Sequence, residues 1–189
     1  MVRWTPGTRD RLRDAALELF AQQGIEETTV AEIAAAVGVT ERTFFRHFAD
    51  KREVLFAGQE HFQAAFVDAA AGAPRDTTPL EAVRLAVITG GSWFEDDHRA
   101  FSRRRQGVIL ANSGLYEREL LKMAALSRAM RDTLRARDVD EPTATLAAET
   151  GTMVFRLAFE QWIADDETRS VPEIARERFE QLDALHAAD

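Results

Sequence analysis

A short stretch near the N-terminus, between residues 28 and 51, carries side chains whose types and spacing could bind a nucleic acid. Guanidinium, imidazole, ammonium and hydroxyl groups bond phosphate oxygens, and an arginine can also bond both acceptors of one guanine. An aromatic ring can contact a thymine methyl group. This chemistry is that of nucleic-acid recognition. The residues expected to contact DNA are Thr28, Thr29, Thr40, Arg42, Thr43, Phe45, Arg46, His47 and Lys51.

Two short helices joined by a tight turn would position these groups. Thr29, with a glutamate three residues later, has the spacing of a capping box at the start of a helix. Gly38 stands where the chain must turn, and glycine tolerates the positive φ that such a turn often needs. Thr40 is a second N-cap, and Phe44 and Phe48 are predicted to anchor the following helix. The pattern predicts a helix-turn-helix, whose second helix enters the major groove.

Each predicted contact has an alternative in a structural role. Arg42 is the best candidate for direct base readout, but it could be a solvated surface residue. Phe45 could touch a thymine methyl group or a sugar, or it could belong to the core. His47 could donate to a phosphate, or it could cap or pack. Thr29 is a helix cap in either case.

Three blocks of sequence carry a resemblance to a known family. They are RDAALELFAQQG at 13–24, TTVAEIAAAVGV at 28–39 and TFFRHFADKREVLF at 43–56. Through them, residues from about 9 to 56 resemble the DNA-binding domain of the tetracycline-repressor (TetR) family of bacterial transcription factors. The resemblance implies that Thr43 and His47 contact DNA. Phe45 stands where the family usually has tyrosine, so a hydroxyl contact to phosphate is absent.

Composition gives a mixed indication for DNA binding. The net charge is −8, although phosphate contacts favour a basic surface. Residues 1–55 hold eight Lys/Arg against nine Asp/Glu, so the acidity lies mainly in the rest of the chain. We therefore expect modest non-specific affinity, with selectivity set by base contacts and dimer geometry.

Other features of the composition exclude several classes of protein. No cysteine is present, which excludes disulfides and thiolate chemistry. No apolar run approaches ~20 residues, and the N-terminus lacks the apolar segment of a signal peptide. We expect a cytoplasmic protein without a membrane partner.

The chain is predicted to be all-α, because no convincing strand periodicity is present. About nine helices are expected: three in an N-terminal helix-turn-helix domain, and the rest in a helical ligand-binding and dimerisation domain. We place these domains at 1–55 and 56–189, with a linker at 72–79. The expected helices are 8–23, the two of the motif, 50–71, 79–94, 96–111, 115–137, 141–164 and 171–187.

Aromatic and polar residues of the second domain could line a site for a small apolar effector. Each could equally be a core residue. The candidates are Trp93, Phe94, Phe101, Arg104, Asn112, Tyr116, Met123, Phe155 and Phe159.

The helix at 141–164 is apolar on more than one face, so it needs burial on two sides. One side could face a partner subunit in a four-helix dimer bundle, which the resemblance implies. The alternative is the core of a monomer. The candidate interface residues are Ala148, Gly151, Thr152, Trp162, Ile174, Phe179 and Leu182.

Four arginines form the densest basic cluster of this domain: Arg99, Arg103, Arg104 and Arg105. They could hold phosphates such as those of coenzyme A, or they could pair with nearby carboxylates. The nearby carboxylates are Asp96, Asp97, Glu117 and Glu119. The stretches RRRQGVILANSGLYERELLKMAAL and AAETGTMVFRLAFEQW resemble actinobacterial regulators related to the mycofactocin-system regulator. That resemblance implies long-chain acyl-coenzyme A ligands.

Two other classes of function compete with a regulator. An enzyme lacks support, because no nucleophile elbow, phosphate loop or HExxH spacing occurs. No catalytic residue, metal site or cofactor is predicted. A helical ligand- or protein-binding module without specific DNA binding is the other alternative. We expect a homodimeric, sequence-specific regulator: a repressor that a small molecule releases from a palindromic double-stranded operator.

Overall fold

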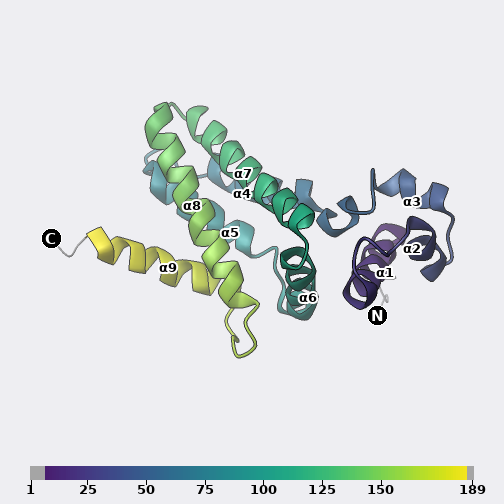
Figure 1. The fold of residues 1–189 in the computed structure, drawn as a ribbon. Coiled ribbons are helices and arrows are strands. Elements are labelled where there is room, and N and C mark those ends of the chain that lie inside the picture. Colours follow the sequence, from purple (N-terminus) through teal and green to yellow (C-terminus); the bar gives the residue numbers. More distant parts are fainter. Residues whose placement is uncertain (1–6, 187–189) are drawn as a thin grey trace, which may run out of the picture. The chain divides into compact units, whose positions relative to one another are not determined.

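Helices make up all the regular secondary structure of residues 7–186, which are the residues that the computed structural model describes. Nine α-helices and two short 3₁₀ helices lie within this range (Figure 1). The prediction of an all-α fold is confirmed. In chain order the helices are α1 (Thr8–Gln23), α2 (Val30–Ala36), α3 (Glu41–His47), η1 (Glu53–Phe56), α4 (Gln59–Ala71), α5 (Pro79–Gly91), η2 (Asp96–His98), α6 (Arg99–Leu110), α7 (Ser113–Arg135), α8 (Glu141–Trp162) and α9 (Val171–His186).

The chain divides into two compact units. The first contains the residues up to Gln59 together with Arg104–Glu117, and the second contains Glu60–Arg103 and the residues from Arg118 onward. The division predicted from the sequence, 1–55 and 56–189, assigned 104–117 to the second domain. In the structure this segment packs with the N-terminal helices, and both Ile109 and Leu115 are fully buried.

One face of α1, which packs on α2 and η1, contributes to the core of the first unit. Leu12, Ala16, Leu17 and Phe20 are its buried residues. The helix predicted over 50–71 is interrupted in the structure. Gly58 has φ 89°, so the chain leaves η1 at a sharp turn and α4 begins only at Gln59.

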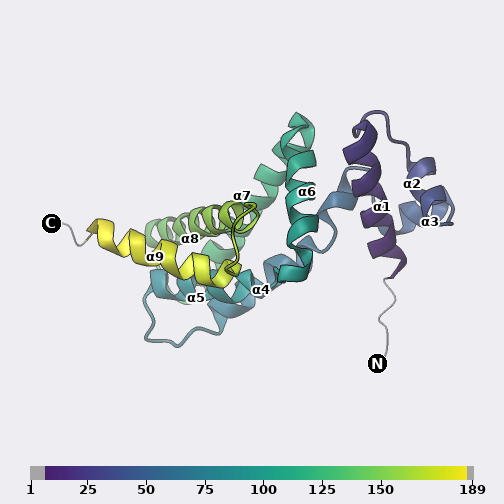
Figure 2. The same ribbon diagram turned by 90° about the horizontal axis from the view of Figure 1, so that it is seen from below.

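In the second unit α5, α8 and α9 pack against one another (Figure 2). Two glycines allow close approach in this unit, one between α8 and α5 and the other between α5 and the Phe66 ring of α4. A Cβ on Gly151 of α8 would lie 2.1 Å from Val83 Cγ1, and a Cβ on Gly90 of α5 would lie 2.3 Å from the Phe66 ring. Small residues at these positions therefore set the distance between the helices.

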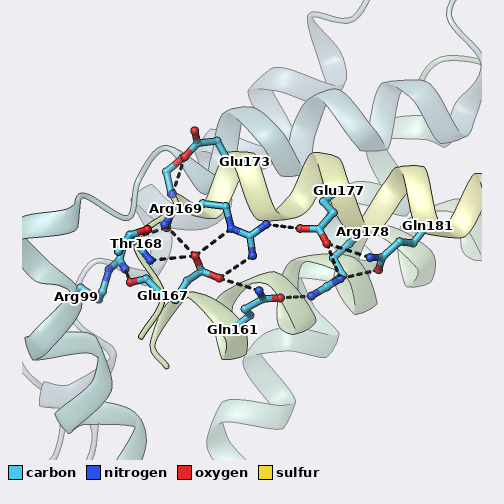
Figure 3. Close-up of polar contacts among 10 residues, drawn as sticks. Arg99, Gln161, Glu167, Thr168, Arg169, Glu173, Glu177, Arg178 and Gln181 are labelled. Atoms are coloured by element: carbon cyan, nitrogen blue, oxygen red, sulfur yellow. Dashed lines mark hydrogen bonds and ion pairs between the residues drawn. The ribbon is translucent and has the colours of Figure 1, made fainter. Parts of the chain in front are cut away.

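Hydrogen bonds centred on Glu167 hold the connection between α8 and α9 (Figure 3). The Glu167 carboxylate accepts from Arg169 N at 2.9 Å, from Arg169 Nη2 at 2.7 Å and from Gln161 Nε2 at 2.7 Å. Arg169 also pairs with Glu177, and Arg178 donates to Gln161. The Arg169 guanidinium, followed by its backbone N–H, holds the pKa of Glu167 well below its usual range.

Substitution of the buried helix glycine tests the packing of α8 on α5. Gly151→Ala should destabilise the protein by about 1–3 kcal/mol through overpacking against Val83, despite the higher helix propensity of alanine. Gly107→Ala is the matched control, because a Cβ there meets no atom within 4 Å. The control should leave stability unchanged or raise it by up to about 1 kcal/mol. Thermal and chemical unfolding measure the stability of both variants. Equal changes in stability would contradict the packing argument.

Acid should weaken the Glu167 network. Because the pKa of Glu167 is lowered in the folded state, its contribution to stability is present above the ordinary pKa of 4.5 and is lost as pH falls below it. Glu167→Gln should therefore destabilise most near neutral pH, and its difference from the parent should shrink in acid. Denaturant titrations from acid to neutral pH measure the difference in unfolding free energy between the variant and the parent. Glu180→Gln is the control, because Glu180 is an exposed residue of α9. A difference that does not change with pH would contradict the prediction.

Candidate nucleic-acid interface and aromatic core

The start of α2 has both bonds of a capping box. Thr29 N donates to Glu32 Oε2 at 2.7 Å, and Glu32 N donates to Thr29 Oγ1 at 3.2 Å. The backbone N–H of Thr29, followed by its hydroxyl, lowers the pKa of Glu32. After α2 the chain turns at Gly38, whose φ is 72°. The caps and the turn predicted from the sequence are therefore present.

Helix α3 begins at a second cap and has two distinct faces. Thr43 N donates to Thr40 Oγ1 at 3.3 Å. Phe44 is fully buried, whereas Phe45 is 53% exposed and its neighbours Arg42 and Arg46 are exposed as well. Arg42, Phe45 and Arg46 are three and four positions apart, so they share one outward face. The alternative of Phe45 as a core residue is excluded.

Two residues predicted to contact DNA, Thr28 and Lys51, are hydrogen-bonded within the protein, and a third, His47, has a buried ring nitrogen. Thr28 is fully buried, and its hydroxyl donates to Gly24 O at 2.8 Å. Lys51 Nζ donates to the carbonyl oxygens of Glu26 at 3.2 Å and of Thr28 at 2.9 Å. Nε2 of His47 is buried and has no hydrogen-bond partner. Thr28 is therefore a structural residue, and His47 would have to turn its ring to donate a bond from Nε2.

Two arginines of the basic cluster bind the end of α8 and the loop after it. Arg99 Nη2 donates to Asp96 Oδ1 at 2.6 Å and to Arg169 O at 2.9 Å, and its guanidinium lies over Trp162. Arg103 Nη2 donates to Ala164 O at 2.8 Å, where a cation meets the negative end of a helix.

The other two arginines bind within the first unit. Arg104 Nη1 lies 2.6 Å from Glu18 Oε2. Arg105 Nε donates to Leu55 O at 2.7 Å, and its guanidinium lies over the Phe56 ring. All four arginines of the cluster therefore have partners in the protein, which opposes the interpretation of the cluster as a phosphate site. Of the carboxylates expected from the sequence, Asp96 is the partner of Arg99.

Six aromatic rings from α4, the α5–η2 connection and α8 form a continuous cluster. Ring centroids of neighbouring members lie between 4.8 Å and 6.1 Å apart. Its members are Phe62, Phe66, Phe94, Phe155, Phe159 and Trp162. Phe94, Phe155 and Phe159 are among the residues predicted to line a ligand site, and Trp162 could serve there as well as in the predicted dimer interface. Phe62 and Phe66 were not among the predicted residues, although their separation of four residues places both on one face of a helix.

The remaining candidates for a ligand site are divided between the two units. In the second unit, Trp93 is exposed and stacks on His61 with ring centroids 6.3 Å apart, and Met123 packs against the core. Phe101, also in this unit, is half-buried. Arg104, Asn112 and Tyr116 belong to the first unit.

Most residues predicted for the dimer interface lie in the core of the protein's own second unit. Four of them have no exposed surface: Ala148, Trp162, Ile174 and Phe179. Gly151 is buried, Thr152 is half-buried with its hydroxyl bonded to Ala148 O, and Leu182 packs on the core. A partner subunit cannot reach the fully buried side chains in this structure. The exposed apolar residues of α8 are Leu146, Met153 and Leu157, which are 71%, 41% and 38% exposed.

No helix within residues 7–186 combines the length and the apolar character that a membrane span requires.

Comparison with known proteins identifies both parts of the chain. Residues 12–57 match the family described as bacterial regulatory proteins, tetR family, and residues 77–187 match the MftR C-terminal domain. The chain is 50% identical over 76 residues to the HTH-type transcriptional regulator TcmR of Streptomyces glaucescens. That match covers 40% of this chain but only 34% of TcmR.

Two further similarities extend over most of the chain. MftR of Mycobacterium tuberculosis, by name a mycofactocin biosynthesis transcriptional regulator, is 25% identical over 162 residues, 84% of this chain and 81% of its own. The fold is similar to that of FadR from Bacillus subtilis, with a TM-score of 0.57 at 20% identity. That similarity covers 92% of this chain and 96% of FadR.

The helix-turn-helix predicted from residues 28–51 lies inside the first match, and the aromatic cluster lies largely inside the second. The chain belongs to the tetR family of bacterial regulatory proteins, with a C-terminal domain of the MftR type, and is a helix-turn-helix transcriptional regulator rather than an enzyme.

Proposed function

We propose that the protein is a homodimeric repressor that binds a palindromic operator through α3. Ligand binding in the second unit then releases the operator. The observation that carries the proposal is the outward face of α3, where Arg42, Phe45 and Arg46 are exposed together on a capped helix. Guanidinium groups on such a face can bond guanine edges or phosphates, and the ring can contact a thymine methyl group. Neither the guanidinium contacts nor the ring contact requires a strongly basic protein.

A dimer is supported by the exposed apolar residues of α8. Leu146, Met153 and Leu157 are seven and four positions apart, so they form one stripe along the helix. Stripes of this kind on a surface helix favour association. A two-fold dimer would present two copies of α3, which matches half-sites about one helical turn of DNA, roughly 34 Å, apart.

An apolar effector is supported by the aromatic cluster. Ligand sites are lined mainly by apolar and aromatic side chains, and the second unit holds six such rings together. The FadR structure of similar fold was determined in complex with stearoyl-coenzyme A. An acyl chain suits the aromatic lining. The arginine cluster does not supply a free site for the phosphates of coenzyme A, because its members are bonded within the protein.

Alanine substitutions on α3 test the DNA-binding face. Arg42→Ala and Arg46→Ala should each weaken operator binding, and loss of a bidentate base contact should weaken it by about 1–3 kcal/mol and relax specificity at one base pair. An operator is first selected from random duplex DNA. The affinity of each variant for it is then measured by titration at two salt concentrations. Arg75→Ala, an exposed arginine in the α4–α5 loop, is the matched control. Loss of binding in the control alone would contradict the assignment of α3.

Charged substitutions on the α8 stripe test the dimer. Met153→Glu combined with Leu157→Glu should convert the protein to a monomer, because two carboxylates would be buried without partners in the interface. Light scattering after gel filtration measures the mass. Leu120→Glu on α7 is the control, since Leu120 is 48% exposed and comparable with Met153. A dimer that persists in the double variant would place the interface elsewhere.

A further inference from the structure

A cavity of about 530 Å³ lies in the first unit, next to the helix-turn-helix. It is bounded by the end of α1, the α1–α2 loop and the last turns of α6, all of which belong to this unit. Its volume falls within the roughly 300–1,000 Å³ of small-molecule sites. The aromatic cluster lies in the other unit, so this cavity is a separate feature.

Apolar side chains line part of the cavity, and one of its lining residues is a glycine. Phe20 and Ile25 are buried residues of this lining, and Val108 lines the side formed by α6. Gly107 also lines the cavity, and a Cβ placed there would meet no atom within 4 Å. Packing within the protein therefore does not require glycine at this helical position. Glycine does leave the α6 backbone open to close approach by a ligand.

The rim carries one uncompensated negative charge. Arg104 is paired with Glu18 at 2.6 Å, and Glu26 is paired with Arg52 at 3.2 Å. Glu27 is exposed, and the described part of the chain offers its carboxylate no hydrogen bond or ion pair. The remaining charge at the cavity is thus a carboxylate, which favours a cationic group.

We propose that this cavity binds a small amphiphile with a protonated amine at one end and a hydrocarbon chain at the other. The amine faces Glu27, and the chain covers Phe20, Ile25 and Val108. Occupancy also acts on the DNA-binding head, because the loop that closes the cavity is bonded to Lys51. Lys51 Nζ holds the carbonyl oxygens of Glu26 and Thr28, directly before the cap of α2. This last step rests on the proposed function.

Calorimetric titration of the full chain with octylammonium, octan-1-ol and octanoate tests the site. Octylammonium should bind saturably with one site per chain, octan-1-ol more weakly, and octanoate not at all. Gly107→Leu should abolish octylammonium binding, because the leucine side chain occupies the space above the backbone. Glu27→Gln should weaken octylammonium binding about two- to fivefold, the range for an exposed ion pair, and leave octan-1-ol binding unchanged. Glu180→Gln is the control for charge.

Three results would overturn the proposal. They are equal binding of octanoate and octylammonium, undiminished binding to Gly107→Leu, and non-saturable heats typical of detergent. Amide NMR spectra of each variant establish that it is folded, and shifts induced by octylammonium should gather on the α1–α2 loop and the end of α6. The binding measurement needs no DNA. Unchanged operator binding in the α3 variants would contradict the repressor proposal but leave this test unaffected, and a failure here would leave the repressor proposal intact.

Discussion

Helices α2 and α3 contain seven residues each and are too short to be stable by themselves. Their N-caps and a few buried rings hold them in place. Thr29 and Thr40 each satisfy a backbone donor that would otherwise lack a partner. Phe44 is fully buried on the inner face of α3, which packs on α2. The exposed arginines of α3 can read DNA only while this small assembly is rigid. The proposed DNA-binding surface therefore depends on the caps and the buried rings that hold these two helices.

Lys51 extends the same principle to the loop between α1 and α2. Its ammonium group bonds two backbone carbonyl oxygens of that loop, so it supports the start of α2 from the far side. An ammonium group has three donors, and the third is free to meet a phosphate. Lys51 can thus be a structural residue and a DNA contact at once, whereas the buried Thr28 has only the first role.

Local signals in the sequence predicted most of the fold. Capping residues, glycines and apolar periodicity act over a few residues, and they placed most helix ends within a few positions of those observed. The break at Gly58 was missed because the apolar spacing on both sides of it is consistent with one continuous helix. Asp96 was among the expected partners of the arginines, but distant partners could not be predicted, since Glu18 lies 86 residues before Arg104 in the sequence.

Periodicity also could not assign the two apolar faces of α8. A helix that is apolar on both sides indicates burial on both sides, but not which side meets its own core. The small residues Ala148 and Gly151 suited a close contact with a partner, and they suited a close contact with α5 equally well. Tertiary packing decides between a partner subunit and α5, because Val83 of α5 occupies the space above Gly151. The stripe left exposed carries Leu146 and Met153.

The aromatic cluster constrains how an effector could enter the second unit. Phe66 and Trp162 are fully buried, and Trp162 Nε1 donates to Asp96 at 3.2 Å, so these rings are held from more than one side. Phe94 and Phe159 are only partly buried and touch Trp162 on the outer side of the cluster. Rotating the outer rings exchanges ring–ring contacts for ring–ligand contacts of the same apolar kind, whereas moving the inner rings breaks a hydrogen bond as well. An apolar ligand would therefore enter beside Phe94 and Phe159, and would alter the contacts of Trp162, over which Arg99 of α6 lies.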